Sequence, residues 1–478
     1  MSFKKELISG VSYIAVAKYS GIFVQLVITS VLARLLTPED FGIVAIATVI
    51  IAFFNILSDI GIGPAIIQNK ELTISDLNSI YSFTVYLGGL MAIVFFCLSY
   101  PIASYYNNKL LIPVCQLLSI PILFQCVTIV PLNLQYKQKS FKFISITTLL
   151  VQIVAGCLAV VAALINAGLY ALLISQIVSA CLLFVIYYNK ARTKFNFKVR
   201  FASLKKIMSF SIYQFLFNVI NYFSRNLDKL LVGKYIGMYA LGFYEKSYRL
   251  MMMPLQNITF VITPVMQPLF SSYQDDYKIL ADKYVKLLSV LAYIAFPISV
   301  VLYFISSELV LLLFGTQWTG AIPAFKILSL TVGLQILTST SGAIYQSANS
   351  TKNLFISGCW CAFFMVTSFI VAVYIWGTIE AVACGFLVAQ IANTMQCFYL
   401  LFKTLHYPIN RFLKKAWKPL CISLLLFICC LFSFKCLNLY NGLISLVIKM
   451  VLSFIMYAIF LQLFGEYKMT HWKSVLRK

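Results

Sequence analysis

Three charged residues with the spacing of a helical face lie inside one long apolar stretch, residues 207–236. They are Arg225, Asp228 and Lys229, and separations of three or four residues let them share a face. At such a depth in a bilayer a charge costs about 2.5–3.5 kcal/mol, so it usually faces a protein interior or a water-filled cavity. We expect Arg225 and Lys229 to line a polar cavity. The alternatives are an Arg225–Asp228 ion pair and a Lys229 side chain that extends to the membrane surface.

Other apolar stretches carry charges too. Glu245 and Arg249 are four residues apart with the acid first, which favours a helical ion pair as much as a cavity lining. Lys18 lies about 12 Å along the first stretch, too deep to reach the surface easily, and is expected in the cavity. Asp59, near the inner end of the second stretch, is expected to bind a ligand or to act at a gate. Lys449 is shallow, and we expect its side chain to extend to the surface.

Composition assigns the chain to the membrane proteins. Of its 478 residues, 61% are hydrophobic and 11% are charged, which is not typical of a soluble protein of this size. Stretches of about twenty apolar residues predict an all-α polytopic membrane protein with fourteen transmembrane helices. We place these helices at residues 10–34, 41–67, 78–104, 110–134, 144–165, 167–188, 207–236, 240–270, 285–305, 324–348, 354–376, 380–402, 419–435 and 442–465.

Basic residues concentrate in the terminal and even-numbered loops of this arrangement. By the positive-inside rule, both termini are predicted to lie in the cytoplasm. The formal net charge of +23 is therefore interpreted as an orientation signal and not as a nucleic-acid-binding surface. The basic runs at residues 190–206 and 411–418 could also contact anionic lipid headgroups, but loops that only fix orientation look the same. The odd-numbered loops hold Arg34, Lys109, Lys234, Lys326 and Lys435.

No motif for catalysis or metal binding is recognisable in the sequence. The 13 cysteines lie mostly in apolar segments without a CxxC pair, which is typical of small buried hydrophobic residues. His406 and His471 lie in or near basic segments and have no nucleophile or carboxylate in a catalytic pattern. There is no P-loop. We therefore expect no enzymatic activity, no cofactor and no metal site.

An internal repeat becomes visible when the chain is laid on itself at an offset of 200 residues. The two halves share a basic residue at one helix end, a glycine eight positions on, and a proline near the end of the next helix. Six helices per half predict a parallel repeat about an axis along the membrane normal. The matched pairs are Arg34 with Lys234, Gly42 with Gly242, and Pro64 with Pro264.

The same offset aligns two polar stripes. Each stripe recurs at three- and four-residue steps and so lies on one helix face. We expect the two stripes to face each other across a central cleft that forms a transport pathway. The aligned positions are Lys18 with Asn218, Gln25 with Arg225, and Thr29 with Lys229. The predicted domains are an N-terminal lobe (1–188), a basic linker (189–206), a C-terminal lobe (207–402), and a segment with the last two helices (403–478).

A cleft with a net positive charge suits an anionic solute, above all a phosphate or diphosphate, because arginine and lysine are the usual partners of these groups. Carboxylates in the cleft could bind a coupling proton or cation. The candidate substrate-binding residues are Lys18, Gln25, Arg225, Lys229 and Arg249. The candidate coupling or gating residues are Asp59, Asp228 and Glu245.

Three motifs resemble one known family. VLARLLTPEDFGIVAIATVI, DIGIGPAIIQ and NLDKLLVGKYIGMYALGFYEKSYRLMMMP are similar to segments of the bacterial polysaccharide exporters, the lipid-linked oligosaccharide flippases of the multidrug/oligosaccharidyl-lipid/polysaccharide superfamily. The resemblance covers nearly the whole chain in length, helix count and helix order.

The resemblance implies a fold and an activity. It implies two six-helix lobes in a V, with two further helices that border a groove for a polyprenyl tail. It implies movement of an undecaprenyl-diphosphate-linked oligosaccharide across the cytoplasmic membrane by alternating access, for capsule, O-antigen or exopolysaccharide assembly, with a glycan polymerase and chain-length machinery as partners. By position, Lys18, Arg225 and Arg249 match the basic residues thought to hold the diphosphate.

Two other functions stay open at this point. A cation-coupled exporter of small amphipathic compounds usually has twelve helices and a more acidic cavity. A glycan polymerase or ligase needs a substantial outer loop, and no predicted outer loop exceeds roughly twenty residues.

Overall fold

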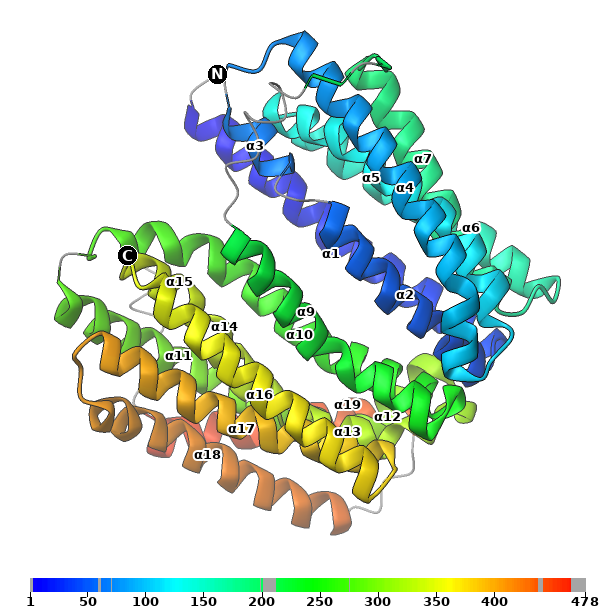
Figure 1. The fold of residues 1–478 in the computed structure, drawn as a ribbon. Coiled ribbons are helices and arrows are strands. Elements are labelled where there is room, and N and C mark those ends of the chain that lie inside the picture. The colour runs from blue at the N-terminus through cyan, green and yellow to red at the C-terminus, as the bar shows by residue number, and fades with distance from the viewer. Residues whose placement is uncertain are drawn as a thin grey trace. The chain divides into compact units, whose positions relative to one another are not determined.

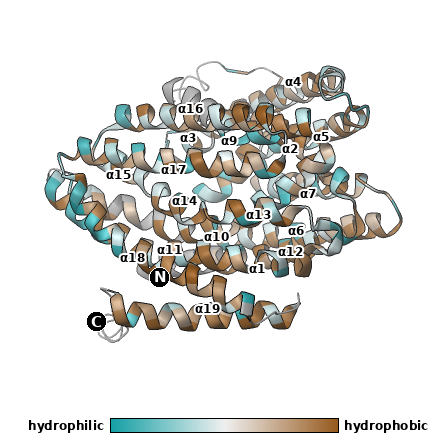
Figure 2. Ribbon diagram, turned by 90° about the horizontal axis from the view of Figure 1, so that it is seen from below, coloured by the Kyte–Doolittle hydropathy of each residue, from teal (hydrophilic) through white to brown (hydrophobic). Residues whose placement is uncertain are grey.

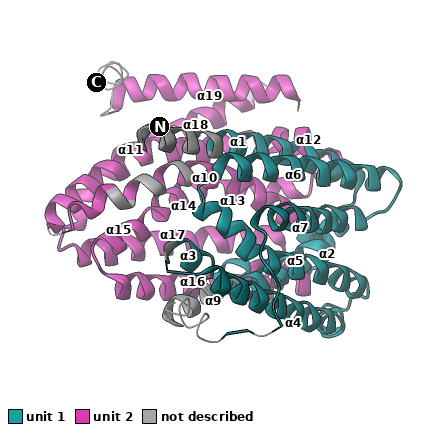
Figure 3. Cartoon of the chain, turned by 90° about the horizontal axis from the view of Figure 1, so that it is seen from above, with its two compact units in different colours: residues 1–226, 237–242 teal, residues 227–236, 243–478 magenta. Residues whose placement is uncertain are grey.

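The computed structural model describes residues 3–58, 62–69, 71–197, 199–200, 212–274, 276–436 and 442–465. Within these ranges all regular secondary structure is helical, which confirms the predicted all-α class. The chain divides into two compact units (Figure 3). Unit 1 comprises residues 1–226 and 237–242, and unit 2 comprises residues 227–236 and 243–478.

In its described residues, unit 1 contains seven complete helices. In it α4 packs on α5, α5 on α7, α6 on α7, and α1 on α6 (Figure 1). A capping box starts α4, because the Thr73 hydroxyl accepts from the Asp76 backbone while the Asp76 carboxylate accepts from the Thr73 backbone. Their bounds are α1 Phe3–Leu35, α2 Pro38–Ser58, α3 Ile62–Gln68, α4 Ile74–Tyr106, α5 Leu111–Lys137, α6 Phe141–Leu164 and α7 Tyr170–Ala191.

The charged stretch from the sequence forms a helical hairpin. Helix α9 (Ile212–Leu231) continues as a π-helical turn (Val232–Ile236), and α10 (Met238–Ser271) follows after Gly237. Gly237 has φ of 115°, a conformation that glycine adopts without strain. The hairpin therefore turns at Gly237, and residues at equal distances before and after it come to similar levels along the two helices.

Unit 2 holds the remaining helices. The sequence predicted one span at 324–348, and the structure has three short helices there, with a bend of 46° between α13 and the two that follow. At the two breaks the hydroxyls of Thr331 and Thr340 donate to the carbonyls of Leu328 and Leu337, a local bond that competes with helix continuation. The helices are α11 Tyr277–Phe304, α12 Ser306–Phe314, α13 Ala321–Ser329, α14 Val332–Ser339, α15 Ser341–Ser347, α16 Thr351–Ile375, α17 Ile379–Thr404, α18 Ile409–Cys436 and α19 Leu443–Phe464.

In the described part of the chain, 11 helices are long and apolar enough to cross a membrane, or 12 if the bent pair in 321–347 is one span. Hydrophobic residues dominate helices such as α19 (Figure 2). Helices α9 and α10 are not among these candidates, and they carry the charges Arg225, Asp228, Lys229, Glu245, Lys246 and Arg249. The structure thus supports a polytopic membrane protein, and the number of fourteen helices stays a prediction.

One crossing in unit 1 involves both glycines of the predicted repeat. A methyl group added at Gly42 would overlap the carbonyl oxygen of Met238, and one added at Gly242 would overlap the carbonyl oxygen of Pro38. Positions 38 and 238 differ by the same offset of 200 as positions 42 and 242. The two contacts are therefore equivalent under the repeat, and they let the starts of α2 and α10 approach backbone to backbone.

Candidate functional site

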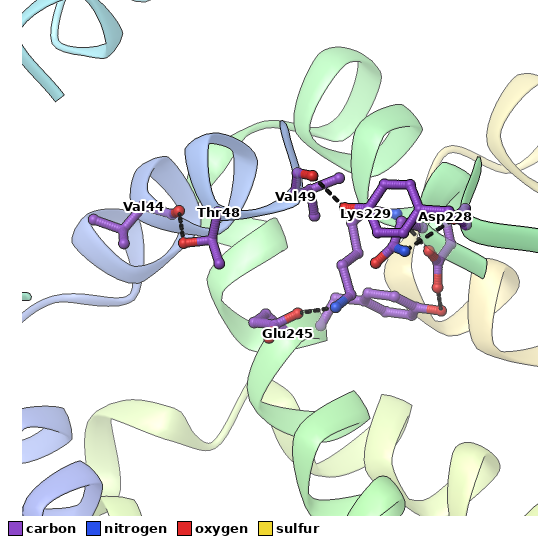
Figure 4. Close-up of polar contacts among 9 residues, drawn as sticks. Val44, Thr48, Val49, Asp228, Lys229 and Glu245 are labelled. Atoms are coloured by element: carbon purple, nitrogen blue, oxygen red, sulfur yellow. Dashed lines mark hydrogen bonds and ion pairs between the residues drawn. The ribbon is translucent and has the colours of Figure 1, made fainter. Parts of the chain in front are cut away.

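Asp228 is completely buried in unit 2 and is held by α10. Its Oδ2 accepts a hydrogen bond of 2.9 Å from the Tyr244 hydroxyl, and its Oδ1 accepts one of 2.8 Å from the Lys229 backbone N–H (Figure 4). The alternative of an Arg225–Asp228 ion pair is not formed among the described residues. The hairpin brings Tyr244 to the carboxylate, and helical spacing within α9 could not reveal this partner.

Lys229 forms an ion pair across the same hairpin. Its Nζ lies 2.7 Å from Glu245 Oε2 and 4.7 Å from the centre of the Tyr248 ring. Lys229 stands eight residues before Gly237 and Glu245 eight residues after it, so the turn sets them opposite each other. Glu245 thus pairs with Lys229 and not with Arg249, which was one of the two alternatives for it. The Lys229 side chain is 11% exposed, so the alternative of an extension to the surface is not seen.

Arg225 and Arg249 are exposed and stand twelve residues before and after Gly237. Twelve residues correspond to roughly 18 Å along an α-helix, so each guanidinium lies far from the hairpin turn. Among the residues that the structure describes, neither has a carboxylate within ion-pair distance. These two groups keep their charge available for an external anion, which the paired Lys229 does not.

Two of the predicted residues lie on α1 in unit 1. Lys18 is half-buried, near the middle of the helix. The Gln25 side chain serves helix packing: its Oε1 accepts a 2.9 Å bond from Gln152 of α6, and its Nε2 donates to Thr29 at 3.3 Å. Gln152 also donates to the carbonyl of Gly21 at 2.9 Å. Asp59 lies outside the described residues.

Lys246 is a buried cation whose role the sequence did not indicate. Only 1% of it is exposed, and its Nζ lies 5.2 Å and 5.6 Å from the ring centres of Phe314 and Trp318. The neighbouring Ser247 hydroxyl donates to the carbonyl of Ala321 at 2.8 Å. These contacts fix α10 to the turn between α12 and α13. An aromatic pair four residues apart after an apolar run was the signal that could have pointed to a cation.

Lys449 does not extend to the surface as expected, because it pairs with the buried Glu308 of α12. Glu308 also accepts a hydrogen bond of 3.1 Å from Ser445. Ser453 contacts Cys430 and Tyr457 donates to the carbonyl of Tyr293. The α19 residues of these contacts recur every fourth position, at 445, 449, 453 and 457, so one polar stripe on an otherwise apolar helix docks it against unit 2.

Removing one partner of this pair is expected to destabilise unit 2 strongly. Glu308→Leu would leave the Lys449 ammonium buried without a counter-charge, a loss of about 3–5 kcal/mol. The double variant Glu308→Leu/Lys449→Leu should recover most of it, because no buried charge remains. Thermal unfolding of the purified proteins in detergent measures both, and a double variant as unstable as Glu308→Leu would contradict the ion-pair explanation.

No group of three or more histidine, cysteine, aspartate or glutamate side chains in the described ranges could hold a metal ion. The candidate residues that the structure describes are polar or charged, and they belong to both units: Lys18, Gln25 and Arg225 to unit 1, and Asp228, Lys229, Glu245 and Arg249 to unit 2. In unit 2 both carboxylates are already hydrogen-bonded or ion-paired.

Comparison with known proteins places the chain among polysaccharide biosynthesis proteins. Residues 31–323 match the family described by that name. The chain is 29% identical over 434 residues to the lipopolysaccharide biosynthesis protein WzxC of Escherichia coli K12, covering 89% of this chain and 87% of that one. It is 24% identical to the teichuronic acid biosynthesis protein TuaB of Bacillus subtilis 168, covering 88% of each.

Solved structures show the same fold at low sequence identity. The lipid II flippase MurJ, in an inward closed conformation, matches with a TM-score of 0.73 and 15% identity, covering 94% of this chain and 98% of that one. An inward-facing multidrug resistance MATE transporter matches with a TM-score of 0.58 and 14% identity, covering 80% and 95%. The chain therefore has the fold of these solved membrane proteins.

Proposed function

Because the chain belongs to the family of polysaccharide biosynthesis proteins, we propose that it is a flippase. It moves an undecaprenyl-diphosphate-linked oligosaccharide from the inner to the outer leaflet of the cytoplasmic membrane. The proposal is carried by two exposed guanidiniums, Arg225 of unit 1 and Arg249 of unit 2, neither of which has a carboxylate partner among the described residues. Similarity to WzxC, TuaB and MurJ supports a lipid-linked glycan as the substrate class.

The charges on α9 and α10 favour a diphosphate. Four cations and two carboxylates lie on these helices, a balance of four minus two, or +2. Lys229 is ion-paired with Glu245 and Lys246 is buried beside two aromatic rings, so the exposed cations of these helices are Arg225 and Arg249. Guanidinium groups bind phosphate oxygens through paired N–H donors. Lys18 on α1 supplies a further amine from the first half of the repeat, and the lipid tail stays in the bilayer.

The Lys229–Glu245 pair is our candidate for ion coupling. A coupling cation that binds Glu245 in place of Lys229 would release the lysine amine toward an anion. Asp59, beyond the described residues, keeps its predicted role at a gate.

Both termini are proposed to lie in the cytoplasm, and a glycan polymerase with its chain-length machinery is proposed to receive the product. No covalent step is part of this function, so the protein is proposed not to be an enzyme.

Deletion of the gene tests the function directly. A flippase predicts that lipid-linked repeat units accumulate in the inner leaflet, where an added membrane-impermeant glycosidase reaches them only after the cells are opened. Accumulation in the outer leaflet would indicate a polymerase or ligase. Absence of accumulation together with increased sensitivity to cationic dyes would favour the amphipathic-compound exporter.

Exchanging the two residues of the Lys229–Glu245 pair distinguishes a structural role of the ion pair from a role in ion coupling. Lys229→Met should lower export and stability together, because Glu245 loses its counter-charge. The exchange Lys229→Glu/Glu245→Lys should restore stability, since the ion pair is reformed with reversed polarity. If export also returns fully, the pair is structural only. If folded protein returns without export, the polarity matters for transport, as the coupling proposal requires.

A further inference from the structure

The described residues of the basic linker after α7 are hydrogen-bonded along α4. We call the described part of residues 193–200 the strap. Backbone N–H groups of Lys194, Asn196 and Arg200 donate to side chains of α4, with distances of 2.9, 2.8 and 2.7 Å. The acceptors are the side-chain oxygens of Asn78, Ser82 and Ser79, respectively. The strap is therefore an ordered element of unit 1, held through its main chain.

Because the strap is attached to α4 through its main chain, its side chains can point either toward the protein or away from it. Thr193 is 5% exposed and Val199 packs on the apolar cluster of α3, α4 and α5, so these two residues face the protein. Lys194, Phe195 and Phe197 are exposed. The strap thus has an inner face that binds α4 and an outer face that combines cationic and aromatic side chains.

An exposed aromatic group marks this outer face. The Phe197 side chain is 84% exposed, and its ring centre lies 5.1 Å from that of Phe195. Phe195 lies in turn 5.6 Å from Tyr86 of α4, whose hydroxyl donates to the Phe197 carbonyl at 3.1 Å. Exposure of the Phe197 ring to water is unfavourable, whereas its burial among the acyl chains beneath lipid headgroups is favourable.

Four cations lie close to the aromatic group in the sequence. Lys190 and Arg192 are exposed at the end of α7, shortly before Lys194 of the strap, and the Lys190 Nζ lies 5.8 Å from the centre of the Phe143 ring. Arg200 is exposed as well, and its guanidinium is held at 3.0 Å by the Ser75 hydroxyl. The nearest carboxylate in the sequence of α4, Asp76, is engaged by the capping box with Thr73. The main chain at Lys194 and Arg200 is fixed beside an outward phenylalanine. A charged loop that only sets orientation requires no such fixed backbone.

We propose that the strap is a binding site for the headgroup of an anionic phospholipid of the bilayer. The four cations contact the phosphate, and the Phe197 ring inserts among the acyl chains. Basic and aromatic side chains at the membrane interface are the combination that holds anionic lipid. The site lies on unit 1 alone and does not depend on the proposed transport function.

Native mass spectrometry of the full chain tests the site, after release from nanodiscs with equal parts of phosphatidylglycerol and phosphatidylcholine. The variant Lys190→Gln/Arg192→Gln/Lys194→Gln/Arg200→Gln should retain about tenfold less phosphatidylglycerol than the unaltered chain. Phe197→Ser should lower retention several-fold with no change in charge. The matched control removes the same number of charges from the other basic segment, with Arg411, Lys414, Lys415 and Lys418 changed to glutamine.

The outcomes separate the proposal from its rivals. Equal losses in the strap variant and in the control would show that only total charge matters and would overturn the site. Unchanged retention in Phe197→Ser and in the strap variant would overturn it as well. A strap that prefers added undecaprenyl phosphate over phosphatidylglycerol would be a site for substrate recruitment instead. Displacement by inorganic phosphate alone would indicate a soluble anion as the ligand.

Discussion

Arg225→Ala is expected to lower the amount of surface glycan by about 10- to 100-fold, because one charge-assisted contact to a phosphate oxygen contributes roughly 1.5–3 kcal/mol. The guanidinium is exposed and has no carboxylate partner among the described residues, so its loss should leave the fold intact. Arg225→Lys keeps the charge but not the paired donors, and should retain an intermediate activity.

The measurement compares surface glycan with the amount of folded protein in the membrane. Arg249→Ala is expected to behave like Arg225→Ala, since it stands at the same distance from Gly237 on the other helix. Lys352→Ala, which removes an exposed cation at the start of α16, is the matched control and should be neutral. Full glycan output from Arg225→Ala/Arg249→Ala at normal expression would refute the assignment of these two residues to the diphosphate.

The fold class could be predicted from the sequence because composition and span length are strong signals in a membrane protein. A charge inside an apolar stretch is just as visible, so Arg225 and Lys229 stood out at once. Their partners did not, because helical spacing only reports neighbours within one helix. The turn at Gly237 sets Lys229 against Glu245, and that register includes a π-helical turn that no periodicity in the sequence indicated.

Lys449 shows a second limit of sequence analysis: the position of a residue along its helix does not identify its partner on another helix. Its position near a helix end made an extended side chain reasonable, yet Glu308 reaches it from a short helix, α12, that was not expected. The predicted helix at 285–305 ends inside the apolar run VLYFISSELVLLLF, and the residues after it are expected to form a loop. A single glutamate within such a run is itself a reason to search for a buried cation elsewhere in the chain.

That the polar stripes of α1 and α9 face each other across one cleft remains a prediction. The structure shows that equivalent residues of the two stripes have different contacts. Gln25 is bonded to Gln152 and Thr29, so it contributes to the packing of α1 against α6, whereas its repeat equivalent Arg225 is exposed. A repeat fixes which positions correspond, but the partner of each side chain depends on the neighbouring helix, which differs between the two halves.

The glycine crossing in unit 1 gives the second large effect. Gly42→Ala should destabilise the protein by about 1–3 kcal/mol, the usual cost of overpacking, because the added methyl group meets the backbone oxygen of Met238 and no side chain can move aside. Gly89→Ala in α4 is the control. Nothing lies within 4 Å of a methyl group there, so the higher helix propensity of alanine should make that change neutral or stabilising.

Gly242→Ala should have the same effect as Gly42→Ala, since its methyl group meets the carbonyl oxygen of Pro38 at the equivalent contact. The two changes act on one crossing, and a shift of α2 from α10 that accommodates the first also makes room for the second. The double variant should therefore lose clearly less stability than the sum of the single losses. Thermal unfolding in detergent measures all three, and strictly additive losses would show that the two glycines serve separate contacts rather than one joint shared by both halves of the repeat.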